Sequence, residues 1–115
     1  MKFKLILAPV KPDKTDAIVD AAKAVGATGA TIIPARGTGM HEAKTFFGLT
    51  LEGPTDIVMF LLEEHLVTKV MEAVQETGEF DRPGTGIAFV LSVDKVLGLD
   101  SQIEKFKEEV QDKYL

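Results

Sequence analysis

The spacing of apolar and polar positions changes between two periods along this chain. Residues 2–9 alternate and then run apolar, which predicts a first strand that Pro9 stops. Residues 11–26 place apolar side chains three, four and seven positions apart, with Pro12 near the start and Gly26 after the end. This spacing predicts an amphipathic helix. The residues expected on its buried face are Ile18, Ala21, Ala22 and Val25.

A second strand completes the first strand-helix-strand unit, and a second such unit follows after residue 54. Residues 29–36 form a short β-branched run, and Pro34 within it predicts a sheet edge or a bulge because proline cannot donate to a ladder. Residues 55–63 predict an apolar strand, 64–78 a second helix closed by Gly78, and 86–93 a fourth strand. The residues expected on one face of the second helix are Leu66, Val70, Met71 and Val74.

Two segments stand outside this repeat. Residues 37–54 contain four glycines, and a loop of that length in a compact domain is usually functional or disordered. Its apolar side chains predict an interaction surface, or equally a short hairpin that extends the flanking strands. These side chains are Phe46, Phe47, Leu49 and Leu51. Residues 100–115 carry a capping-box pattern and an apolar stripe, which predict a C-terminal helix.

The order strand, helix, strand, long loop, strand, helix, strand is typical of the ferredoxin-like split βαβ plan. We therefore expect a single α+β domain over residues 1–115, with an antiparallel four-stranded sheet in the order 4-1-3-2. That order places the two "GTG" sequences, 37–39 and 84–86, on one rim but on opposite sheet edges. Each is either an ordinary turn or part of an anion site, and the two could meet only between subunits.

Composition narrows the classes of function. The formal net charge is −5 without a basic cluster, which argues against nucleic acid as a partner. The chain has no cysteine, so disulfides and thiolate chemistry are excluded. The apolar runs are too short to span or insert into a membrane, and no signal-peptide pattern is present. We expect a cytoplasmic protein.

Candidate catalytic and metal groups are few. His41 stands beside Glu42, and His65 follows Glu63 and Glu64, but neither histidine has a metal-ligand spacing. Adjacent carboxylates need not face one site, and no serine or threonine has a histidine at a motif spacing. We expect no catalytic residues and no required cofactor.

Three stretches together resemble the P-II signal-transduction family, and the resemblance covers roughly residues 2–99. They are "PVKPDKTDAIVDAA", "VGATGATIIPARGTG" and "TGEFDRPGTGIAFVLSVDKVLGL". The resemblance implies a homotrimeric ferredoxin-like regulator of nitrogen or related metabolism. It also implies that the loop 37–54 docks on a protein partner such as a membrane transporter. In that loop, the candidate contacts are His41, Lys44, Phe46, Phe47 and Leu49.

By the same resemblance, a small effector, an adenine nucleotide, binds between subunits near the base of this loop. Gly29 and Thr31 would lie by the adenine, the stretch Gly37, Thr38 and Gly39 at the loop base, and Gly84, Thr85 and Gly86 at the phosphates. The candidate effectors are AMP, ADP and ATP.

The chain departs from the family pattern where the phosphate charge is compensated. Ile87 stands where the family has a lysine, and Gly98 and Asp100 stand where it has arginines. At the loop base, Met40 and His41 replace an arginine and a glutamine.

The cations best placed to compensate are Arg36, Arg82 and, in the loop, Lys44. Fewer cations favour a mono- or diphosphate over a triphosphate. Two other classes stay open: a small ferredoxin-like oligomeric enzyme, and a cation-tolerance-type trimer that binds metal.

Overall fold

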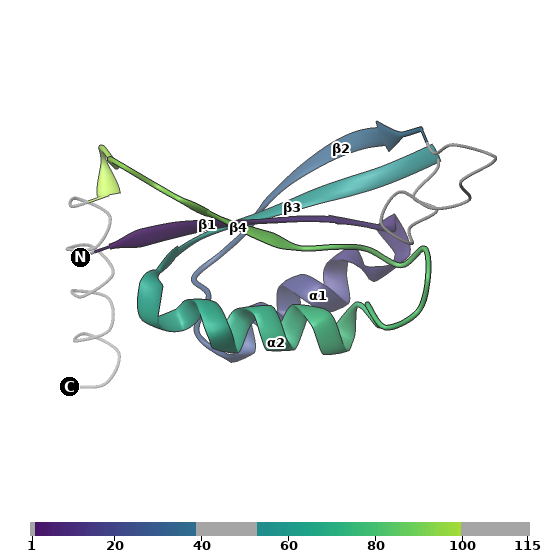
Figure 1. Ribbon diagram of the computed structural model, residues 1–115, viewed down its shortest axis with the longest axis horizontal. Helices are drawn as coiled ribbons and strands as arrows, with labels where there is room; N and C mark the ends of the chain where they lie inside the picture. Colours follow the sequence, from purple (N-terminus) through teal and green to yellow (C-terminus); the bar gives the residue numbers. More distant parts are fainter. Residues whose placement is uncertain (1, 39–52, 100–115) are drawn as a thin grey trace.

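The computed structural model describes residues 2–38 and 53–99. Figure 1 shows a curved sheet with two helices beneath it. In chain order the elements are β1 (Phe3–Val10), α1 (Pro12–Ala24), β2 (Thr31–Gly37), β3 (Gly53–Glu63), a 3-10 turn (Glu64–Leu66), α2 (Val67–Thr77) and β4 (Phe89–Ser92). The expected βαββαβ order is confirmed, and the fold is ferredoxin-like α+β.

All strand pairings in the sheet are antiparallel, and the strand order is β2-β3-β1-β4. This is the expected 4-1-3-2 order, so β1 and β3 are central while β2 and β4 are edges. Pro34 lies on the edge strand β2, opposite Asp56 of β3, in keeping with the expectation that it avoids the middle of the sheet.

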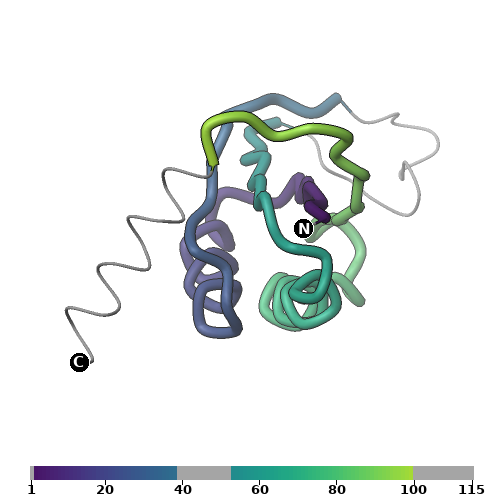
Figure 2. Tube along the Cα trace, turned by 90° about the vertical axis from the view of Figure 1, so that its left-hand side faces the viewer, coloured from purple at the N-terminus to yellow at the C-terminus, as the bar shows by residue number. Residues whose placement is uncertain are grey.

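Both helices lie side by side on one face of the sheet, as Figure 2 shows from the end of the molecule. Alternation along the central strands directs every second side chain toward them. The fully buried core residues of the strands are Ile6, Ala8, Val10, Val58 and Phe60, and those of the helices are Ile18, Ala22, Val70 and Val74. The periodicity thus predicted the buried positions Ile18, Ala22, Val70 and Val74 correctly, whereas Ala21 and Met71 are only partly buried and Val25 lies beyond α1 and is exposed. The second helix was predicted over 64–78, but α2 begins at Val67, and the partly buried Leu66 belongs to the 3-10 turn before it.

The prediction that Pro9 stops the first strand is wrong, because β1 continues through Pro9 to Val10. The carbonyl of Pro9 accepts a hydrogen bond from the Ile87 N–H at 3.1 Å, so Pro9 directs its backbone groups toward the β4 side. The ladder with β3 therefore needs no N–H from Pro9, and the strand passes through it intact.

Pro9 instead shortens the fourth strand. The register of Leu7 with Phe89 and the isolated bridge of Val10 with Gly86 bring Pro9 opposite Ile87. A proline there cannot return the second hydrogen bond of that pair. The ladder breaks, and β4 covers Phe89–Ser92 rather than the predicted 86–93.

The two strands beside the long loop also differ from their predicted bounds. β2 is Thr31–Gly37 rather than 29–36, and β3 begins at Gly53 rather than at 55, because Gly37 pairs with Gly53. The ends of the predicted loop 37–54 are thus strand. Its remainder, and the predicted C-terminal helix over 100–115, lie outside the described residues.

Candidate functional site

The segment that follows α2 is a closed turn built by its own hydrogen bonds. After Gly78 ends the helix, the Arg82 N–H donates to the Glu79 carbonyl at 2.9 Å. The Thr85 hydroxyl lies 2.9 Å from the carbonyl oxygens of both Glu79 and Arg82, so it joins the two ends of the turn. Gly84 has a φ of 79°, a conformation that side chains disfavour.

Gly86 permits the close approach of this turn to the end of β1. A Cβ added there would lie 2.8 Å from Cε1 of Phe80 and 2.9 Å from the Pro9 carbonyl oxygen. Both distances are too short for a side chain, so Gly86 is needed for packing. Each residue of the "GTG" at 84–86 therefore has a structural role, whatever else it does.

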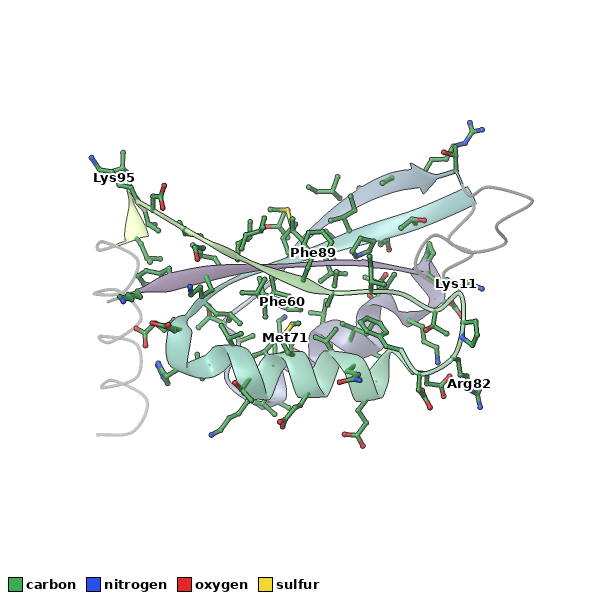
Figure 3. The ribbon with its side chains drawn as sticks, viewed as in Figure 1. Lys11, Phe60, Met71, Arg82, Phe89 and Lys95 are labelled. Atoms are coloured by element: carbon green, nitrogen blue, oxygen red, sulfur yellow. The ribbon has the colours of Figure 1, made fainter. Side chains whose placement is uncertain are left out.

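The turn lies against the start of α1. The Lys11 N–H donates to the Thr85 carbonyl at 3.4 Å, and Lys11 and Arg82 are found at the same end of the molecule in Figure 3. Arg82, whose side chain is 72% exposed, forms an ion pair with Glu79, as does Lys14 of α1. The turn thus has cations beside it from two separate elements.

Lys11 and Lys14 were missed by the sequence reasoning, although a signal for them existed. The carboxyl end of β1 must lie at the rim where the fourth strand starts, because the two strands are antiparallel neighbours. The residues just after β1 therefore belong to the same rim as residues 82–86. Topology, rather than any motif, could have found them.

A groove of about 640 Å³ opens between α2 and this turn. Apolar side chains and polar groups both contribute to it, and its volume falls within the range of small-molecule sites. Its lining includes Val67, Thr68, Met71, Gln75, Phe80 and Ile87. Figure 3 shows Met71 on the side of α2 that faces the sheet.

The first "GTG" lies at the same end of the sheet but on the other edge. Arg36 pairs with Pro54 and Gly37 with Gly53, and Arg36 and Thr38 are exposed. Because β3 and β1 intervene, three strand spacings of about 4.8 Å separate β2 from β4, or roughly 14 Å. Within one chain these residues do not form a common site with the turn at 82–86.

The residues expected near an adenine are farther away still. Gly29 precedes β2 and Thr31 begins it, whereas Arg36 to Thr38 lie at its other end. The structure therefore brings together Arg82, Gly84, Thr85 and Gly86, and leaves Gly29 and Thr31 apart from them. Six further candidates lie outside the described residues: Gly39, His41, Lys44, Phe46, Phe47 and Leu49.

The described histidine is a surface residue. His65 is 69% exposed, and its Nδ1 lies 3.2 Å from a carboxylate oxygen of Glu63. Across residues 2–38 and 53–99, His, Asp and Glu side chains nowhere gather in a group of three or more that could hold a metal ion. None of the helices in these ranges has the length and apolar character needed to cross a membrane.

Comparison with known proteins identifies the family of the chain. The family model described as "Nitrogen regulatory protein P-II" matches residues 3–102. Over 100 residues the chain is 31% identical to the nitrogen regulatory protein P-II of Azospirillum brasilense, with 83% of this chain and 89% of that protein covered. The corresponding protein of Pasteurella multocida is also 31% identical over 100 residues, with the same coverage.

A solved structure shares the fold. The crystal structure of Arabidopsis thaliana PII bound to citrate superposes with a TM-score of 0.63, at 24% identity, over 80% of this chain and 78% of that one. Fold and relatives together define a ferredoxin-like signal-transduction protein. More narrowly, the chain belongs to the nitrogen regulatory protein P-II family.

Proposed function

We propose that this chain is a non-catalytic regulator that binds an anionic effector, an adenine mono- or diphosphate, at the seams of a homotrimer. The observation that carries the proposal is the closed turn at 82–86, which contains Arg82 and has Lys14 of α1 beside it at the rim of the sheet. Backbone N–H groups in such turns and nearby cations are the usual means of holding a phosphate.

The edge strands supply the argument for a seam. Ile32 and Ile33 of β2 are 42% and 43% exposed, and Phe89, Val90 and Leu91 of β4 are exposed to a similar degree. Exposed apolar edge strands tend to pair with another chain. If β4 of one copy meets β2 of the next, that neighbour can bring Arg36 to Thr38 to the turn at 82–86, whereas its Gly29 and Thr31 lie at the other end of the same strand.

The loop 37–54 is the proposed contact with a protein partner, such as a membrane transporter. Its support is the apolar sequence around Phe46 and Phe47, in the segment of the chain between β2 and β3. An effector that binds with different affinity to two states of the loop would change which surface the partner meets. The Arabidopsis relative was crystallised with citrate, also a small anion, which supports an anionic effector here.

Calorimetric titration with AMP, ADP, ATP and citrate tests the effector proposal. We expect saturable binding of AMP or ADP, and Arg82→Ala should weaken it about fivefold to tenfold, because a charge-assisted hydrogen bond is lost. Lys23→Ala is the matched control, since Lys23 is an exposed cation in the last turn of α1, away from the rim. Equal binding by wild type and Arg82→Ala, or no binding of any of the four anions, would refute the site.

A further inference from the structure

Glu79 stands between the cations that flank the turn. One of its carboxylate oxygens lies 3.4 Å from Nζ of Lys14 and 3.4 Å from Nη1 of Arg82. Lys14 comes from α1 and Arg82 from the turn itself, so a single carboxylate bridges the two elements. Both cations that would meet an incoming phosphate already face an anion belonging to the chain.

The backbone conformation of residue 79 is unusual for a glutamate. Glu79 has a φ of 54° and is the one non-glycine residue with a positive φ in the described part of the chain. Its carbonyl accepts the Thr85 hydroxyl, which fixes residue 79 in the same closed turn as Gly84. Glycine or asparagine would satisfy this conformation with less strain, so the glutamate contributes a carboxylate that the turn does not need for its shape.

The carboxylate changes the charge that the turn presents. Lys14 and Arg82 supply two positive charges, Glu79 neutralises one of them, and the exposed neighbour Asp81 adds a further negative charge. An incoming phosphate must compete with Glu79 for the same N–H donors. Repulsion by a fixed negative charge grows with the charge on the ligand, so it acts most strongly on a triphosphate.

We propose that Glu79 is a resident counter-anion that lowers the affinity of the turn for highly charged nucleotides and so sets its preference for mono- and diphosphates. The inference rests on the proposed effector site, because it concerns the selectivity of that site. An effector phosphate displaces the Glu79 carboxylate from Lys14 and Arg82 when it binds.

The test compares Glu79→Gln with wild type by calorimetric titration of AMP, ADP and ATP in low salt. Removing one nearby charge should tighten ATP about tenfold and AMP about threefold, and the difference should shrink in 0.5 M NaCl, where the screening length is only about 4 Å. Glu76→Gln removes the same charge from an exposed position in α2 that has no ion pair in the described structure. It should change each affinity less than twofold.

Glu79→Gly protects the test against a folding defect, because glycine suits the φ of residue 79 and also removes the carboxylate. It should show the same gain for ATP as Glu79→Gln.

Three outcomes distinguish the role of Glu79 from the effector site itself. Nucleotide binding by wild type with no tighter ATP binding in either Glu79 variant would overturn the role of Glu79 and leave the effector site standing. Binding of ATP only in the variants would support the counter-anion and refute nucleotide sensing by the native chain. Failure of wild type and of both Glu79 variants to bind any of the three nucleotides would overturn both proposals.

Discussion

The central and edge strands of this sheet are built from similar apolar residues but are buried very differently. β1 and β3 bury every second side chain, from Ile6 to Val10 and from Val58 to Leu62, under the helices. No residue of β2 or β4 is buried. Even Ile32 and Val90, which pair with buried Val58 and Ile6, stay exposed.

The reason lies in the width of the helical layer. Two helices cover two strands, and α1 packs on β3 while α2 reaches β1. The edge strands extend past this cover, so their apolar side chains meet solvent on both faces in a single chain. Exposed apolar strands of this kind mark an interaction surface, so we expect variants of the central strands to test folding and variants of the edge strands to test the proposed assembly.

The largest expected effect comes from truncating one phenylalanine in each region. Phe60 is fully buried on β3, so Phe60→Ala should cost about 4 kcal/mol of unfolding free energy through lost burial and a cavity. Phe89 on β4 is 41% exposed, and Phe89→Ala should cost about 1 kcal/mol in the unassembled chain. Urea denaturation at several protein concentrations measures both.

The two losses should differ in their dependence on concentration. The Phe60→Ala loss is a property of the fold and stays constant, whereas the Phe89→Ala loss should grow with concentration as assembly contributes to stability. A Phe89→Ala loss that does not change with protein concentration would mean that the edge strands have no partner.

Assembly itself gives the next largest effect. Leu91→Lys places a charge on the exposed edge strand β4. If this strand is buried in a seam between subunits, the variant loses about 2 kcal/mol per subunit of the favourable free energy of burying the leucine side chain. We expect sedimentation velocity to show a trimer for wild type and a monomer for the variant. Leu97→Lys is the control, because Leu97 is 84% exposed and lies beyond β4. A trimeric Leu91→Lys variant would contradict the proposed seam.

Most of the fold could be predicted from the sequence, because periodicity depends on local spacing and the strand order follows from the handedness of the crossovers. The helical core positions Ile18, Ala22, Val70 and Val74 are buried as expected, and right-handed crossovers fixed the strand order. The error at Pro9 arose because its effect depends on which neighbour its backbone faces. A proline that shortens the adjacent strand, rather than its own, cannot be recognised before the register is known.

The candidate site was less accessible to sequence reasoning. Arg82 and the glycines on either side of Thr85 lie close together in the sequence, so they could be recognised there as a candidate motif. The ion pair of Glu79 with Lys14 joins residues 65 positions apart, and it depends on a left-handed backbone at a glutamate. No propensity predicts that conformation for glutamate. The charged groups that lie near the turn could therefore be identified only from the structure.

The smallest effects should come from two side-chain hydrogen bonds, one in each region. The buried Thr15 hydroxyl of α1 donates to a carboxylate oxygen of Asp56 on β3 at 2.7 Å, and Thr15→Val should cost about 1.5 kcal/mol because a charged acceptor loses its donor. At the edge, Lys4 donates to the Ser92 hydroxyl at 2.9 Å in full view of solvent. Water can replace that partner, so Ser92→Ala should cost less than about 0.5 kcal/mol.

Chemical denaturation of the two variants beside wild type gives both values, and Thr55→Val serves as the control. Thr55 is also buried, but among the described residues its hydroxyl contacts only the Gly53 carbonyl, at 3.3 Å, so the loss of stability in Thr55→Val should fall between the other two. A Ser92→Ala loss as large as that of Thr15→Val would mean that β4 is held by its own contacts within the subunit. The edge would then need no neighbour, and the contrast between central and edge strands would lose its link to assembly.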